Sequence, residues 1–167
     1  LGIWTRSQRE EYVSQVGMAV EGIEGCQLII KLRHNWESSR DYNDISRSYG
    51  INPVICDNID LYKLIGISEV VVTVSSTGGL EAIAAEKPLV IFDPFDTPGS
   101  SFYNSEYIQF LDNVGDFSST VFKIISDHRF RKDLIHKQHL FLEDHIFKND
   151  GRAAERIYNQ IINMIKG

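Results

Sequence analysis

The stretch VVVTVSSTGGLEAIAAEKPLVIF, residues 70–92, decides how the rest of the chain is interpreted. An apolar run stops at two serines, a threonine and two glycines, and a helical pattern then begins with Glu81 in its first turn. A second apolar run follows a Lys-Pro step. Neither run alternates with polar residues, which is typical of strands covered on both faces. We therefore predict a strand at 68–74, a helix, and a strand at 89–93, with the two strands parallel.

The segments on either side continue this alternation. Apolar residues at helical spacing, with closing glycines, predict helices, and short runs rich in β-branched residues predict strands. The remaining predicted elements are a helix at 7–22, a strand at 26–34, a helix at 37–50, a strand at 53–56, one or two helical turns at 60–65, a loop at 94–113, and helices at 118–127, 129–147 and 151–166, the first of these three capped by Ser118-Ser119. The expected fold class is α/β, with a parallel sheet of five or six strands and helices on both faces.

Composition excludes several classes of protein. With 167 residues, 43% of them hydrophobic, the chain is long enough for one domain with a core. Its net charge is −6 and it has no run of Lys and Arg, so we expect no nucleic-acid partner. No apolar run approaches the roughly 18 residues that a membrane span needs, and we expect a cytoplasmic protein. Because the chain opens at LGIWTRS without Met, we expect a piece of a longer polypeptide.

Cysteine and histidine give little indication of a metal site. Cys26 and Cys56 stand in or beside apolar runs, which predicts free thiols. The five histidines lack the spacing of metal ligands, and the helical offset of His136 and His139 is typical of a solvated helix face. We predict no metal.

The turn holds the groups that point to chemistry: Ser75, Ser76, Thr77, Gly78 and Gly79. They follow the carboxyl end of a parallel strand, where ligands bind in open sheets. A helix N-terminus offers unpaired N–H groups, glycines let an anion approach the backbone, and hydroxyls add donors. Such a turn can hold a phosphate or diphosphate without a basic side chain. The alternative is that the hydroxyls cap the helix and the glycines relieve crowding against the sheet.

Carboxylates near this turn extend the hypothesis. Glu81 is placed to accept two hydrogen bonds from a vicinal diol such as a ribose, or only to complement the helix dipole. Asp93 and Asp96 follow the next strand and could bond sugar hydroxyls, although turn formation with Pro94 explains them equally well. The turn and Glu81 together describe a nucleotide site.

Four aromatic residues in the 94–113 segment have two open interpretations. They either pack this loop onto the sheet or cover an acceptor or a partner domain. The four are Phe102, Tyr103, Tyr107 and Phe110.

The run LYKLIGISEVVVTVSSTGGLEAIAAEKPLVIFD, 61–93, resembles the nucleotide-binding core of the C-terminal domain in GT-B-fold glycosyltransferases and in the similar UDP-N-acetylglucosamine 2-epimerases. In those families a Ser/Gly turn, a helix carrying Glu-Ala and a Gly-Lys-Pro-like step follow one another. The resemblance covers most of the chain: LIIKLRHN, 28–35, resembles a strand ending in Lys-x-His-Pro. DGRAAERIYNQIINMI, 150–165, resembles the closing helix of capsule and teichoic-type polysaccharide enzymes.

The chain also departs from the pattern of those families at three points. Asn35 stands where proline is usual, and Glu86 replaces the glycine before the Lys-Pro step. One residue fewer than in the epimerases precedes the glutamate of the turn.

Position by position, the resemblance implies a nucleotide-sugar site. Ser76, Thr77, Gly78 and Gly79 would hold the diphosphate of a UDP- or CDP-type donor, and Glu81 its ribose hydroxyls. His34, at the Lys-x-His-like strand end, could face the same cleft. It could equally bond a neighbouring loop.

For the whole chain, the resemblance implies a Rossmann-like three-layer sandwich, one half of a GT-B fold. Residues 1–167 would be a single nucleotide-sugar-binding domain, the C-terminal half of a longer two-domain enzyme, with a nucleotide-sugar as substrate and no cofactor. The expected function is glycosyl transfer in polysaccharide or surface glycan biosynthesis. Acceptor and catalytic base would come from a missing N-terminal half, in cis or as a partner subunit, which could also bring peripheral membrane association. The chain alone is therefore expected to be inactive.

Three alternatives to glycosyl transfer stay open. The chain could belong to a nucleotide-sugar 2-epimerase or to a CDP-glycerol-type glycerophosphotransferase. It could also be a non-catalytic subunit of a split transferase.

Overall fold

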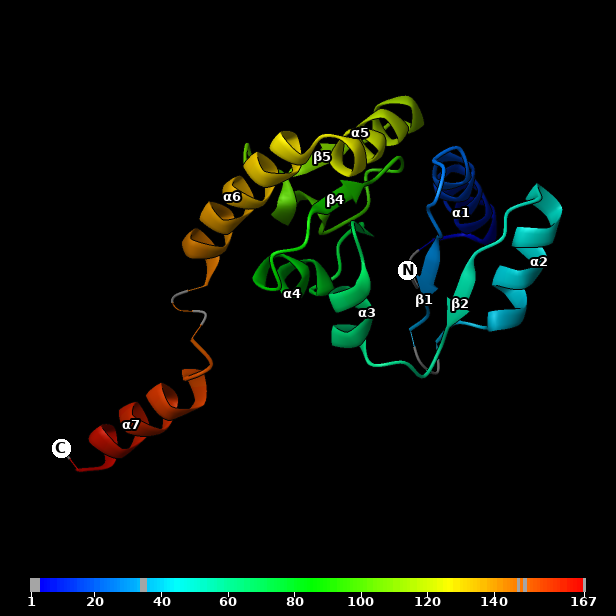
Figure 1. The fold of residues 1–167 in the computed structure, drawn as a ribbon. Coiled ribbons are helices and arrows are strands. Elements are labelled where there is room, and N and C mark those ends of the chain that lie inside the picture. Colours follow the sequence, from blue (N-terminus) through cyan, green and yellow to red (C-terminus); the bar gives the residue numbers. More distant parts are fainter. Residues whose placement is uncertain (1–3, 34–35, 147, 149, 167) are drawn as a thin grey trace.

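The computed structural model describes residues 4–33, 36–146, 148 and 150–166, and over these residues the chain is α/β (Figure 1). Its elements in chain order are α1 (Arg6–Glu21), β1 (Ile29–Lys31), α2 (Ser39–Tyr49), β2 (Val54–Cys56), α3 (Leu61–Ile67), β3 (Val71–Thr73), α4 (Gly78–Ala84), β4 (Leu89–Phe92), the 3₁₀ helix η1 (Ser100–Tyr103), β5 (Gln109–Leu111), α5 (Val114–Ser126), α6 (His128–His145) and α7 (Ala153–Lys166).

Every strand pair in the described part of the chain is parallel, as predicted. β1 pairs with β2, and β3, β4 and β5 form a second sheet in that order. The expected single sheet of five or six strands is not present in this form, because no ladder joins β1 to β3 across the described residues.

β4 is the centre of the core. All four of its residues are buried, which confirms the prediction that this strand is covered on both faces. Since successive side chains of a strand alternate, Val90 and Phe92 join a cluster with α1 and α5, whereas Leu89 and Ile91 join a cluster with α4 and α6. β3 is less enclosed than predicted, with its three residues half-buried.

Helix α1 packs on both sheets. Its residues Val16 and Ala19 belong to the cluster around β4. Val13 belongs to a separate cluster with α2 and with Leu32 beyond β1, and Tyr12 contacts both clusters. A capping box in which Thr5 and Gln8 bond reciprocally fixes the start of this helix.

Two predictions for the second half of the chain are wrong. Helix α5 begins at Val114 and not at residue 118, because the Asn113 side chain accepts the N–H of Asp116 at 2.9 Å and caps the helix four residues early. The 94–113 segment is not loop throughout, since it contains η1 and the parallel strand β5. A strand of three residues is too short to show periodicity in the sequence.

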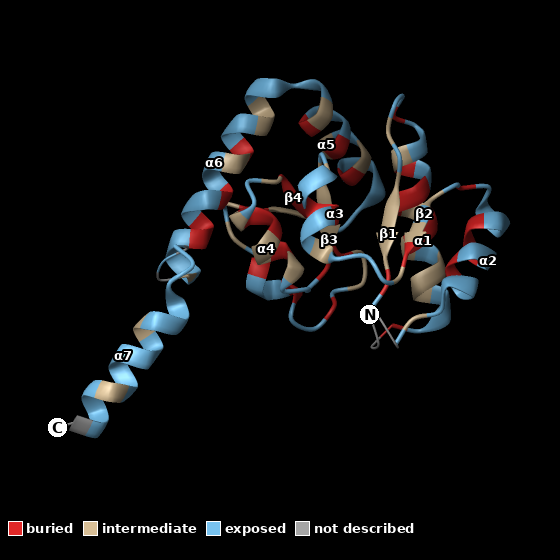
Figure 2. Cartoon of the chain, turned by 60° about the horizontal axis from the view of Figure 1, so that its bottom comes forward, coloured by how far each residue is buried: buried red, intermediate tan, exposed pale blue. Residues whose placement is uncertain are grey.

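Helix α7 extends away from the rest of the chain (Figures 1 and 2). Large apolar side chains of this helix are exposed: Ile157, Tyr158, Ile161, Met164 and Ile165. None of the helices in the described residues combines the length and the apolar character that crossing a membrane requires.

The two cysteines agree with the sequence prediction. Cys26 is half-buried, Cys56 is buried, and both are free thiols.

Candidate functional site

The predicted turn lies at the carboxyl edge of the three-stranded sheet. Thr73 of β3 stands opposite Ile91 of β4, so Ser75 and Asp93 both follow the carboxyl ends of neighbouring strands. The segment before α1 reaches the same edge, because Trp4 Nε1 donates to Thr97 Oγ1 at 2.9 Å. Three parts of the sequence therefore meet where ligands bind in open parallel sheets.

The turn has an inner part, whose amides (Gly78 and Gly79) bond within the turn, and an outer part, formed by the amides of Ser76 and Thr77 and the hydroxyls of Ser75 and Thr77. The N–H of Gly78 donates to Ser76 Oγ at 3.2 Å and that of Gly79 to the Ser76 carbonyl at 3.0 Å. These two amides, predicted to hold an anion, are thus engaged within the turn. Ser75, Ser76 and Thr77 are exposed. No residue in the described ranges bonds the amides of Ser76 and Thr77 or the hydroxyls of Ser75 and Thr77, so the outer part keeps free donors.

Tyr103 of η1 supports the turn from inside. It is 2% exposed, and its hydroxyl donates to the Ser76 carbonyl at 2.7 Å. A Cβ on Gly79 would lie 2.6 Å from this hydroxyl and 3.2 Å from Leu89 Cδ2, so the crowding interpretation holds for Gly79. Burial raises the pKa of Tyr103, and the nearby Glu81 carboxylate acts in the same direction. The phenol therefore stays neutral and donates.

Glu81 lies one turn into α4 with an incomplete set of hydrogen bonds. Its Oε1 is 3.5 Å from the Tyr62 hydroxyl of α3, a long contact. Its Oε2 is buried, and no donor in the described part of the chain reaches it. A buried carboxylate oxygen without a donor costs free energy. A ligand hydroxyl could reach this oxygen only after the Glu81 side chain turned outward, so the predicted ribose role stays a prediction.

Tyr62 is a neighbour of the site that the sequence did not indicate. Its ring is 66% exposed although it stands beside Glu81. The sequence shows only that Tyr62 lies near the start of the short helix before β3, two residues after its cap Asp60. That Tyr62 stands beside Glu81 depends on how α3 packs on α4.

Asp93 is bonded entirely by its own loop. It is 2% exposed, and its carboxylate accepts the N–H and hydroxyl of Thr97, both at 2.7 Å, and the N–H of Phe95 at 3.3 Å. These bonds match the turn-forming interpretation of Asp93. Its neighbour Asp96 is exposed, with a positive φ of 49°.

The predicted residue His34 lies outside the described residues, as does Asn35. Just before them, Lys31 Nζ donates to the carbonyls of Leu32 and Asp57 at 2.7 and 2.6 Å. This ammonium group therefore links the carboxyl ends of β1 and β2.

The loop aromatics mostly pack on the sheet. Tyr103 belongs to the cluster around Leu89 and Ile91, and Tyr107 and Phe110 pack against that cluster half-buried. Only Phe102 among the four is exposed. The packing interpretation therefore accounts for three of these side chains.

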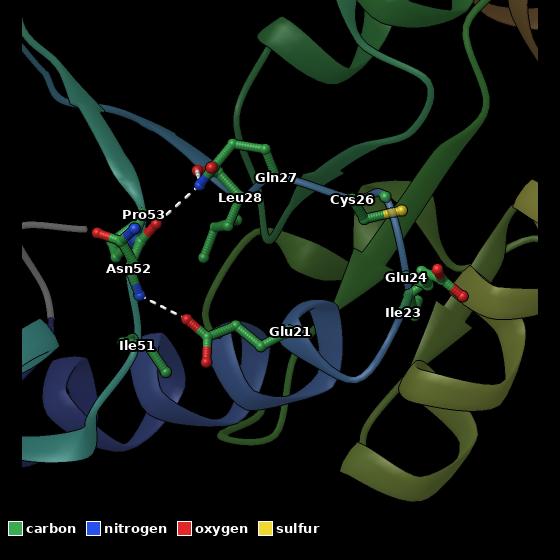
Figure 3. A pocket seen from close by; sticks show the side chains of 11 residues that line it. Glu21, Ile23, Glu24, Cys26, Gln27, Leu28, Ile51, Asn52 and Pro53 are labelled. Atoms are coloured by element: carbon green, nitrogen blue, oxygen red, sulfur yellow. Dashed lines mark hydrogen bonds between the residues drawn. The ribbon is translucent and has the colours of Figure 1, made fainter.

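A pocket of about 350 Å³ lies at the opposite edge, at the amino ends of β1 and β2 (Figure 3). Its polar groups are partly engaged: Glu21 Oε1 accepts the N–H of Asn52 at 2.5 Å, and Gln27 Nε2 donates to the Asn52 carbonyl at 2.7 Å. None of the predicted site residues that the structure describes lines it. Within the described ranges, no three His, Cys, Asp or Glu side chains are grouped so that they could hold a metal.

No protein-family model matches the chain, and comparisons with curated proteins and with solved structures gave no match.

Proposed function

We propose that this chain is the nucleotide-sugar-binding domain of a glycosyltransferase that acts in polysaccharide or surface glycan biosynthesis. One observation carries the proposal: Glu81 has a buried, unpartnered carboxylate oxygen one helical turn beyond a turn whose outer donors are free. A nucleoside diphosphate matches both parts, since its ribose offers hydroxyl donors and its diphosphate offers acceptors.

The arrangement of the core supports a Rossmann-like three-layer sandwich, one half of a GT-B fold. Helices α1 and α5 pack on one side of β4, and α4 and α6 pack on the other. In this proposal the chain works in the cytoplasm, and a second domain or subunit supplies the acceptor and the catalytic base.

The chemistry of this half is positioning and charge stabilisation. The amides of Ser76 and Thr77 and the hydroxyls of Ser75 and Thr77 would donate to the diphosphate as it leaves the sugar. Donors that are already fixed stabilise developing negative charge without reorganising, which is a large term in transfer reactions. Glu81 would hold the ribose and so fix where the donor sugar lies relative to the turn.

Calorimetry with UDP-, CDP- and GDP-sugars tests the proposal, with CDP-glycerol included because the same turn would accept its diphosphate. We expect the intact chain to bind at least one donor and Glu81→Ala to weaken its affinity by about ten- to a hundredfold, since a charged hydrogen-bond partner is worth about 1.5–3 kcal/mol. The exposed Glu106 is the matched control, and Glu106→Ala should bind as the parent does. Unchanged affinity after Glu81→Ala would contradict the ribose role, and no binding at all would contradict the function.

A further inference from the structure

Helix α7 carries an apolar stripe along one face. The five members of this α7 stripe are Ile157, Tyr158, Ile161, Met164 and Ile165, each at least 50% exposed. With 3.6 residues per turn, they fall within an arc of about 120° that is centred on Ile161. The rest of the described chain does not cover them: α7 stands clear of the other elements in Figures 1 and 2, and no α7 side chain belongs to a hydrophobic cluster of the described residues.

The helix itself needs a partner surface. It is 14 residues long, a length at which an isolated helix is marginal in water. Three members of the stripe are isoleucines, whose branched side chains lower helix propensity. The ion pairs of Arg152 with Glu155 and of Arg156 with Asp150 lie at the start of α7 and are partly exposed, so they contribute little. Packing of the stripe is therefore the main available source of stability.

The composition of α7 favours an uncharged partner. No charged residue occurs from position 157 to position 165, and the polar residues between the members of the stripe are Asn159, Gln160 and Asn163. A helix that lies on an anionic membrane typically has Lys and Arg along its polar face. A partner of opposite charge would likewise need charged groups beside the stripe.

The stripe is also complementary to a reversed copy of itself. Its members lie in pairs at equal distances from Ile161: Ile157 and Ile165 four residues away, and Tyr158 and Met164 three residues away. In an antiparallel pair of α7 helices, Ile157 would lie level with Ile165 of the second copy, and the two Ile161 side chains would meet at the two-fold axis. Antiparallel helices also place opposite dipole ends together.

The exposed area is large enough for such a pair. At the exposures of the five side chains, the stripe offers roughly 700 Å² per copy, so a pair covering most of it would bury about 1,000–1,400 Å² in total, the lower range of stable interfaces. A groove of about 420 Å³ adjoins the stripe at Ile157, with Ile146 and Ala153 on its apolar side. The end of a reversed α7 would reach this level and cover the groove as well.

We propose that the α7 stripe is the contact surface of a homodimer, in which it packs antiparallel against the α7 stripe of a second copy of this chain. This inference does not depend on the nucleotide-sugar site.

Light scattering and sedimentation equilibrium on the intact chain test the inference. We expect the parent chain to have twice the mass of one copy. Ile161→Glu should raise the dissociation constant of the dimer more than about a hundredfold, because two carboxylates would be buried against each other at the axis. Asn163→Glu is the matched control: it adds the same charge to an exposed residue on the opposite face of α7, and the dimer should persist.

Cross-linking tests the direction of the two helices. Under mild oxidation Ile161→Cys should form a disulfide with its own copy. Ile157→Cys should not, because the two cysteines of an antiparallel pair would lie about 12 Å apart along the helix axes. The parent chain, with Cys26 and Cys56, gives the background. Equal cross-linking of both variants would overturn the antiparallel arrangement.

Two results would overturn the homodimer. One is a parent chain that stays monomeric at about 100 µM, well above the micromolar affinity of weak interfaces. The other is a dimer that survives Ile161→Glu. If a monomeric parent instead bound vesicles of phosphatidylcholine and phosphatidylglycerol and Ile161→Glu did not, the stripe would belong to a lipid surface.

Discussion

Two junctions lie side by side at the carboxyl edge of the sheet, residues 75–79 after β3 and residues 93–97 after β4. Both are rich in oxygen-bearing side chains. In the second junction each carboxylate oxygen of Asp93 has a donor from its own loop, and Thr97 is also bonded to Trp4. In the first, outward donors have no partner in the described chain, and neither does one oxygen of Glu81, two residues beyond it. Polar groups at a sheet edge are therefore candidates for binding only where their own fold leaves them unsatisfied.

Replacing a carboxylate by an amide should cost much more stability at Asp93, in the second junction, than at Glu81, next to the first. Asp93→Asn replaces an acceptor oxygen by an amide NH₂, which cannot accept the N–H of Thr97. We expect a loss of about 2–3 kcal/mol in the free energy of unfolding, because buried donors lose their partner. Urea unfolding measures it. Asp96→Asn is the control, since an exposed Asn tolerates the positive φ at this position and should change stability by less than about 0.5 kcal/mol.

Thr97→Val should have the next largest effect. The substitution keeps the branched shape but removes a hydroxyl that donates to Asp93 and accepts from Trp4. We expect a loss of about 1–2 kcal/mol, together with a shifted indole N–H resonance for Trp4. An unchanged indole resonance would show that this bond does not anchor the segment before α1.

The buried phenol below the first junction predicts a smaller effect at high pH. In the unfolded chain Tyr103 ionises near pH 10, whereas burial raises its pKa in the folded chain. Stability from the neutral phenol is therefore complete below pH 10 and is lost as the pH rises above it. Unfolding measured from pH 9 to 11 should show a shallower decline in Tyr103→Phe. Tyr12 and Tyr42, whose pKa values are also raised by burial, contribute equally to both chains.

The smallest effect on stability is expected at Glu81. Glu81→Gln alters a carboxylate that has only a long contact to Tyr62 and one unpartnered oxygen. We expect the free energy of unfolding to stay within about 0.5 kcal/mol of the parent value. A loss as large as that of Asp93→Asn would remove the contrast between the two junctions and assign Glu81 to the scaffold.

The sequence predicted those elements that depend on local pattern. The continuous apolar run of β4 and the glycine that ends α2 at residue 50, with a φ of 66°, are examples. It missed β5, because three residues are too few to show a strand's alternation. It also placed the start of α5 at Ser118-Ser119, since serine and asparagine are both good helix caps and the structure uses Asn113.

The sequence predicted where the turn after β3 lies, but not which of its groups the fold leaves without a partner. The Ser76 carbonyl is bonded by Tyr103, 27 positions away, and the surroundings of Glu81 include Tyr62, 19 positions away. Such pairings come from packing and leave no periodic trace. The same holds for Asp93, because only the geometry of residues 93–97 shows that its loop bonds it completely.

Helix α1 packs against both sheets although no backbone ladder joins them. Side chains of α1 therefore couple the two halves of the molecule, together with Cys26 and Leu28, which pack against the cluster around β4. Loosening the inward face of α1 is expected to weaken this coupling, so that the two halves melt less cooperatively.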